Sequence, residues 1–233
     1  MQRLLGWVAI LALGACTVGT PPVAPPNGTQ PGGAGMTRAS FAAVAARVEP
    51  VAERECRIRL PGANCDFLIQ IDPDRRRPAN AYQSETPEGR PVITFTETML
   101  DSTRNPDELA FVMSHEAAHH IRGHLGRQAQ NAAAGAAIFA GLATLTGGSA
   151  ADVQTAQELG AAVGARSYSK EFELEADQLG TVITAKAGYD PWLGAQFFAR
   201  IPDPGDQFLG THPPNAERMQ VVRRTVTDLG LPQ

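Results

Sequence analysis

Four of the chain's five histidines lie within ten positions, in the stretch FVMSHEAAHHIRGH at residues 111–124, together with one glutamate. His115 and His119 are four residues apart, so in a helix their imidazoles lie one turn apart on the same face and can bind one ion. Glu116 is rotated by about 100° around the helix axis, beside the position that the imidazoles leave open. The HExxH pattern therefore predicts a catalytic zinc site in which Glu116 acts as general base.

Two imidazoles do not complete such a site, because a catalytic zinc takes three protein ligands and a water molecule. A second, acidic helix is predicted in SYSKEFELEADQLG, residues 167–180. Glu173 and Asp177 share one face of it, since they are four residues apart, whereas the glutamates at 171 and 175 point elsewhere. The pair offers one carboxylate that binds the metal and one that orients a ligating imidazole. A solvated acidic face is the alternative.

The HExxH segment follows a strong helix start, NPDE at residues 105–108. This start combines a capping Asn, a Pro at the first helical position and two acids near the positive end of the helix dipole. We expect the helix to run from about residue 106 to 125. On that helix His120 would point away from the metal, and His124, about 2.5 turns beyond the first histidine, would lie on the opposite side.

The remaining patterns predict an α+β fold, mostly helical, with a small sheet of about three strands beside the HExxH helix. Further helices are expected over 37–59, 151–187, 191–200 and 216–229, and strands over 65–71, 80–83 and from 91 onward. The Ala- and Gly-rich stretch at 131–150 predicts a closely packed helix or hairpin rather than a membrane span, because small residues dominate it. The strand at 91–98 is expected to pair with a substrate backbone.

The N-terminus, MQRLLGWVAILALGAC, has one Arg and an apolar run too short to span a bilayer. We interpret residues 1–15 as a secretory signal peptide. The ending LGAC resembles the lipobox of bacterial lipoproteins, in which Cys16 is lipidated; ordinary cleavage beside an incidental cysteine is the alternative. By the sorting rule of such lipoproteins, Thr17 points to the outer membrane. Residues 16–35 would then be a lipidated Cys and a flexible Pro- and Gly-rich tether, and residues 36–233 one domain.

Charge and cysteine content narrow the class of protein further. The net charge is only -4 and the basic residues are scattered, so nothing indicates a nucleic-acid partner. With Cys16 lipidated, Cys56 and Cys65 are left as a pair in an oxidising compartment, which predicts a disulfide between them.

These motifs, taken in order, resemble the gluzincin metallopeptidases of family M48, over most of residues 40–225. The matching segments are NAY, VITFTETML, DELAFVMSHEAAHHIRGH, YSKEFELEADQLG and THPPNAERM. The signal peptide and the lack of clear spanning helices point to the periplasmic lipoprotein branch of the family. Two departures are SETPEGRP after the first segment, where a Gly-rich turn is common, and a Ser-Lys pair at 169–170 where Ser-Arg is common.

The resemblance implies one zinc ion per chain, bound by His115, His119 and Glu173. It implies that Glu116 is the catalytic base and that Asp177 lies behind the ligands. The corresponding fold is a zincin-like metallopeptidase domain, and the corresponding function is zinc-dependent hydrolysis of peptide bonds.

A fifth histidine, His212, lies in the loop GTHPPNAER, which the resemblance places near the metal. It would either stabilise the oxyanion or act as a fourth metal ligand; a plain turn histidine before two prolines is the alternative. Arg218 is expected to organise this loop through a pair with a carboxylate, with a surface salt bridge as the other interpretation.

The function that we expect is an endopeptidase on the periplasmic side of the bacterial outer membrane, attached through its lipid and acting on envelope proteins in quality control. Its partners would be polypeptide substrates, the membrane and the outer-membrane assembly machinery. One alternative is a scaffold with a latent metal site that binds assembly intermediates. Another is a structural zinc protein in which His212 completes a closed four-ligand site.

Overall fold

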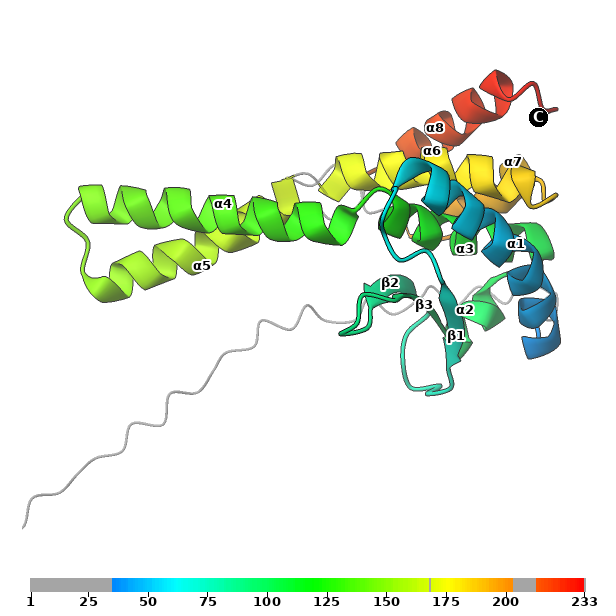
Figure 1. Ribbon diagram of the computed structural model, residues 1–233, viewed down its shortest axis with the longest axis horizontal. Coiled ribbons are helices and arrows are strands. Elements are labelled where there is room, and N and C mark those ends of the chain that lie inside the picture. Colours follow the sequence, from blue (N-terminus) through cyan, green and yellow to red (C-terminus); the bar gives the residue numbers. More distant parts are fainter. Residues whose placement is uncertain (1–34, 168, 203–212, 233) are drawn as a thin grey trace, which may run out of the picture. The chain divides into compact units, whose positions relative to one another are not determined.

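The structure, a computed structural model, describes residues 35–167, 169–202 and 213–232. Helices dominate it and accompany a single three-stranded sheet (Figure 1), so the expected α+β class with a small sheet is confirmed. The elements are α1 (Arg38–Arg59), β1 (Leu68–Asp72), β2 (Ala81–Glu85), β3 (Pro91–Thr96), α2 (Glu97–Ser102), α3 (Pro106–Ile121), α4 (His124–Leu145), α5 (Ala150–Ser167), α6 (Ser169–Lys186), α7 (Pro191–Ala195), the 3-10 turn η1 (Gln196–Ala199) and α8 (Asn215–Asp228).

Helix α1 forms where its apolar spacing predicts, and it covers the core with one face. The hydroxyl of Thr37 accepts a hydrogen bond from the backbone N–H of Ser40, which caps the first turn. The buried positions include Phe41, Val44 and Val48, which recur at helical spacing. Near its end, a disulfide joins Cys56 of α1 to Cys65 in the segment before β1.

The sheet is mixed and has the strand order β1-β3-β2, with β3 parallel to β1 and antiparallel to β2. Strand β3 is therefore central, and all six of its residues are buried. The expected pairing of residues 91–98 with a substrate is wrong, because both edges of β3 already bond to its neighbours. The strand is also shorter than expected: Thr96 ends it, and its hydroxyl accepts from the N–H of Met99 to start α2.

Helix α3 lies between the sheet and α6 (Figure 1) and contacts both. The side chain of Asn105 caps it by accepting from the N–H of Glu108, as the sequence predicts. Its end differs from the expected residue 125. The helix ends at Ile121, and Gly123 adopts a left-handed φ of 65°, which a glycine reaches without steric cost. The chain is redirected there, and His124 begins α4.

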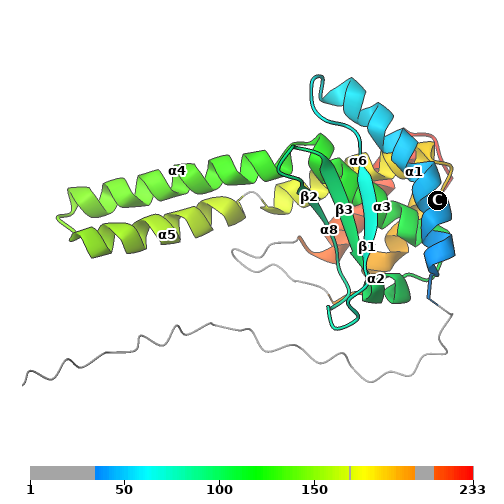
Figure 2. The same cartoon turned by 60° about the horizontal axis from the view of Figure 1, so that its bottom comes forward.

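Helices α4 and α5 form a hairpin (Figure 2) that packs mainly on itself and makes few contacts with the remaining elements. Small residues bring the two backbones together: a Cβ on Gly135 would overlap the carbonyl oxygen of Gly160, and one on Gly164 would overlap that of Asn131. The closely packed hairpin that the Ala- and Gly-rich stretch predicts is confirmed. Among the described residues no helix combines the length and apolar character that a membrane crossing needs.

Helix α6 packs along α3 through a glycine. A Cβ on Gly180 would lie 3.0 Å from the Cα of His115, closer than ordinary van der Waals contact, so a larger residue would push the two helices apart by a few tenths of an ångström. Helix α8 packs in turn on α6. This three-helix arrangement brings together side chains that lie about forty to one hundred positions apart in the chain.

Candidate metal centre

Two helices supply three donor residues that converge. His115 and His119 project from α3 and Glu173 from α6, and their candidate ligand atoms lie within 4.8 Å of one another. The Nε2 atoms of the two histidines are 3.0 Å apart. Each lies 3.3 Å from an oxygen of Glu173, Nε2 of His115 from Oε2 and Nε2 of His119 from Oε1. The three residues that the HExxH and ELEAD motifs single out thus share one small volume.

The donor set fits a zinc ion in chemistry and spacing. Zinc binds imidazole nitrogen and carboxylate oxygen at about 2.0–2.2 Å, so neighbouring donors of a tetrahedral site lie roughly 3.3 Å apart. The separations of 3.0, 3.3 and 3.3 Å are close to that value. A catalytic zinc takes three protein ligands and keeps a fourth position open, and two imidazoles with one carboxylate match that composition.

A buried ion pair lies directly behind His115. Its Nδ1 is 2.9 Å from Oδ1 of Asp177, which is fully buried on α6. Arg218, from α8, donates to both oxygens of Asp177, through Nε at 2.8 Å and Nη2 at 2.7 Å. With Nδ1–H donated to this carboxylate, the lone pair of His115 lies on Nε2, toward the other donors. Arg218 thus pairs with Asp177, the carboxylate that lies behind the ligand candidates.

Burial and neighbouring charges set the protonation of Asp177 and His115. Burial alone would raise the pKa of Asp177, but the Arg218 guanidinium and His115 outweigh it and hold that pKa below its ordinary value. Burial opposes a charged imidazole at His115, yet Asp177 and Glu173 raise its pKa to about 10. These two carboxylates therefore favour positive charge at the donor set.

Glu116 has only 9 % of its surface exposed, on the same helix as the two histidines. Its burial raises the pKa of its carboxyl group, while the positive charges of His115 and His119 work in the opposite direction. A carboxylate out of bulk water, beside the donor set, has the location and the chemistry of a general base.

The position that the sequence predicts for His124 is wrong. Extending α3 as one helix places it on the side opposite the metal, but the break at Gly123 returns it to the donor set. Its Nδ1 lies 2.8 Å from Nδ1 of His119, and its Nε2 lies 3.1 Å from Oε2 of Glu175. Burial lowers the pKa of His124 to about 4, so the ring is neutral at pH 7. The signal that could have found it is Gly123, a common helix-ending residue.

His120 points away from the donor set, as the helix geometry predicts. It is buried, its Nε2 lies 2.9 Å from the carbonyl oxygen of Asn64, and its ring meets that of Phe67 edge-on. Two other candidate residues, the lipidation candidate Cys16 and the loop histidine His212, lie outside the described residues.

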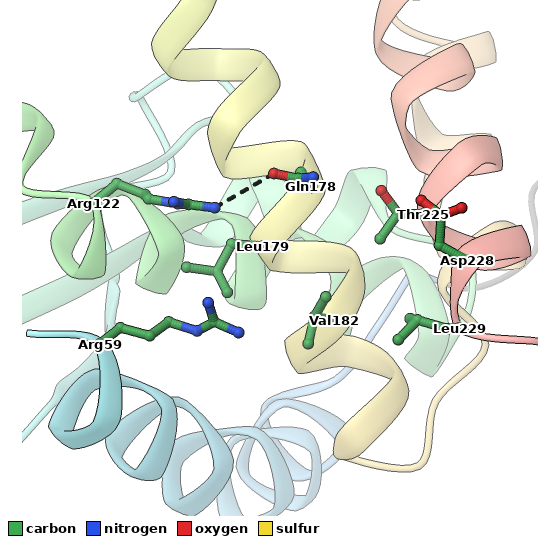
Figure 3. A pocket seen from close by; sticks show the side chains of 8 residues that line it. All are labelled: Arg59, Arg122, Gln178, Leu179, Val182, Thr225, Asp228 and Leu229. Carbon is green, nitrogen blue, oxygen red and sulfur yellow. Dashed lines mark hydrogen bonds between the residues drawn. The ribbon is translucent and has the colours of Figure 1, made fainter.

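A pocket of about 300 Å³ lies on another face of α6 (Figure 3). Arg59 and Arg122 line one side of it and α8 lines the other, and Arg122 donates to Gln178 across its rim at 3.4 Å. None of the three donor residues is among the residues that line it. This pocket is therefore separate from the metal centre.

Comparison with known proteins assigns most of the chain to one family. A family model described as Peptidase family M48 matches residues 39–226, which include every candidate residue of the metal centre. A Vibrio cholerae protein named "Putative beta-barrel assembly-enhancing protease" is 36% identical over 107 residues, which are 43% of this chain and 22% of that protein. The match thus spans about a fifth of the length of this relative.

Proposed function

The chain belongs to peptidase family M48, and we propose that it is a zinc-dependent endopeptidase with His115, His119 and Glu173 as metal ligands and Glu116 as general base. One observation carries the proposal: three donors from two helices converge at the spacing that zinc needs, beside a buried glutamate. The ion pair behind the site supports it, because second-layer carboxylates of this kind orient zinc-binding imidazoles.

Zinc, when bound, would polarise the scissile carbonyl and lower the pKa of a water molecule. Glu116 accepts a proton as the water oxygen bonds to the carbonyl carbon, and later passes that proton to the amine as the C–N bond breaks. Because Glu116 is buried, bulk water does not compete for hydrogen bonds to its carboxylate. Asp177 holds the Nδ1 proton of His115, which keeps the Nε2 lone pair directed at the metal position.

The test uses the purified full chain, with zinc content and cleavage of unfolded casein as measurements. We expect one zinc per chain in wild type and loss of that zinc in Glu173→Ala. Glu116→Gln should keep its zinc and lose about 10²–10⁴-fold in rate, because the general base alone is removed. Glu171→Gln is the control, since Glu171 is exposed on the same helix as Glu173.

The outcomes separate the alternatives. Zinc in wild type with no cleavage by any form would favour a scaffold with a latent site. Cleavage that survives both chelation and Glu116→Gln would exclude the proposed chemistry. In the same assay, higher activity of His212→Ala would favour a role of His212 as a fourth ligand that closes the site, and lower activity a role at the oxyanion.

We further propose a lipid-anchored periplasmic protein: a signal peptide over 1–15, a lipidated Cys16 with a tether over 16–35, and the peptidase domain over 36–233. The lipobox-like LGAC supports the anchor. The expected result is that the wild-type protein fractionates with outer membranes and that Cys16→Ser moves to the soluble fraction with its casein cleavage unchanged. Wild type found only in the soluble fraction would exclude the anchor.

The proposed substrates are envelope proteins, in particular outer-membrane proteins during assembly, with quality control as the role. The support is the name of the Vibrio cholerae relative, "Putative beta-barrel assembly-enhancing protease". The measurement is the half-life of an assembly-defective β-barrel protein in cells that express wild type or Glu116→Gln. A shorter half-life with wild type alone is expected, and equal half-lives would contradict the substrate class.

A further inference from the structure

The second metal-ligand candidate, His119, has its own layer of support, built from residues that the HExxH motif does not include. The ring of His124 contacts it through the two Nδ1 atoms, 2.8 Å apart. On the far side of that ring, Nε2 of His124 lies 3.1 Å from Oε2 of Glu175. The three side chains form one continuous line of hydrogen bonds that runs from the donor set outward to α6.

The direction of these bonds follows from the carboxylate. A carboxylate oxygen accepts, so Nε2 of His124 carries the hydrogen of its bond to Glu175. One hydrogen lies between the two facing Nδ1 atoms, and a His119 ring that binds a metal through Nε2 carries its own hydrogen on Nδ1, so Nδ1 of His124 is the acceptor. The Nδ1 of His119 must then donate to His124. This leaves the lone pair of His119 on Nε2, the atom that lies 3.3 Å from Glu173 and 3.0 Å from Nε2 of His115.

The outer end of the line is itself held in place. Arg127 donates to both oxygens of Glu175, at 2.6 and 3.3 Å. The ring of Phe172 stacks on His124 with centroids 4.5 Å apart and planes at 10°, and it also lies 4.3 Å from the Arg127 guanidinium. The stacking fixes the plane of the His124 ring, and its two hydrogen bonds fix the orientation of the ring within that plane. A histidine that only packs in the core does not need this degree of order.

The two imidazoles of the donor set are supported in parallel ways. His115 donates to Asp177, which Arg218 binds, whereas His119 donates to His124, which is bound to Glu175 and Arg127. Helix α6 supplies both outer carboxylates, Glu175 and Asp177, which lie two and four residues after the ligand candidate Glu173.

We propose that His124, oriented by Glu175, is a positioning residue that fixes the tautomer and the ring orientation of His119 for metal binding. The inference rests on the proposed function, since it takes His119 as a zinc ligand, and it adds to the site two residues outside the motif. Loss of such an outer partner typically weakens metal binding by about 10–100-fold.

The experiment measures the zinc Kd of the full chain by competition with a chromogenic chelator, and the visible absorption spectrum of the cobalt-substituted protein. His124→Phe keeps an aromatic ring against Phe172 but removes the acceptor, and we expect the zinc Kd to rise by about 10–100-fold. His124→Asn returns an acceptor oxygen near the former Nδ1 position and should recover most of the affinity. Glu175→Ala, at a half-exposed position, should raise the Kd by about 10-fold.

Two matched controls separate positioning from packing. His120→Phe makes the same change in a buried histidine whose ring bonds to the carbonyl oxygen of Asn64. Glu171→Ala removes an exposed glutamate of α6. Both should leave the zinc Kd within about twofold of wild type. The cobalt spectrum should change in His124→Phe and not in His120→Phe, because only His124 orients a metal ligand. If His124 served only to pack the core, both variants would change the spectrum alike.

Each result is informative. Zinc affinities of His124→Phe and Glu175→Ala equal to wild type, with unchanged cobalt spectra, would overturn the positioning role while the peptidase proposal stands. If His124→Phe does not fold, Glu175→Ala and His124→Asn decide the question by the same measurements. A wild-type protein that binds no zinc would instead overturn the metal site, and with it the proposed function.

Discussion

Arg218 donates two hydrogen bonds to Asp177, at 2.8 and 2.7 Å, although the two residues lie 41 positions apart and on different helices. Asp177 is fully buried and in turn lies 2.9 Å from Nδ1 of His115. The last helix of the described chain thereby reaches the metal centre without contributing a metal ligand. Its position relative to α6 is part of the site.

Removal of this guanidinium should destabilise the protein strongly. Arg218→Met leaves the buried Asp177 with His115 as its remaining partner, which should cost up to about 3–5 kcal/mol of unfolding free energy. Arg218→Lys should recover part of this loss, because it restores charge but lacks the planar fork. Urea unfolding of the metal-free protein measures both, with Arg224→Met on the exposed side of α8 as control. Equal unfolding free energies for Arg218→Met and the control would contradict this account.

The close approach of α6 to α3 can be tested at Gly180. A Cβ there would lie 3.0 Å from the Cα of His115, so Gly180→Ala should force the helices apart and cost about 1–3 kcal/mol. The zinc affinity should fall with it, because Glu173 moves relative to the histidines. Gly126→Ala on α4 is the control: a Cβ there meets nothing within 4 Å, so the stability and the zinc affinity should not fall.

The disulfide between Cys56 and Cys65 closes a short loop, with a sequence separation of 9 residues. By the loop-closure argument its loss should cost about 2–3 kcal/mol. A reducing agent should lower the melting temperature of wild type and leave that of the Cys56→Ala, Cys65→Ala double variant unchanged. A wild type whose melting temperature does not respond to reduction would contradict the prediction.

Glu55 should make stability depend on acid pH. Burial opposes its charge, but hydrogen bonds from Lys186 at 2.5 Å and Arg59 at 2.9 Å hold its pKa below the ordinary 4.5. Its stabilising effect is therefore complete above pH 4.5 and is lost as the pH falls through the lower folded value. Melting temperatures from pH 7 to 3 should fall less steeply for Glu55→Gln than for wild type. The control is Glu53→Gln, which removes a pair with the exposed Arg57.

Much of the fold could be predicted because the signals are local. The Asn105 cap and the apolar periodicity predict where α3 begins, and the small residues of 131–150 predict a close-packed hairpin. The failures lie where a local pattern meets a non-local choice. Nothing within PVITFT indicates which strands flank it, so the central position of β3 could not be predicted. The left-handed turn at Gly123 places His124 beside His119, whereas an unbroken helix would have placed it on the opposite side.

The same division holds for the candidate site. The sequence by itself determined that His115 faces the same way as His119, and Glu173 the same way as Asp177, because the period of a helix depends only on local backbone geometry. Only the tertiary structure decided that these two faces meet, that Arg218 reaches Asp177 and that His124 returns to His119. Such contacts depend on how helices pack and where the chain turns, and packing is set by the volume and shape of many side chains at once.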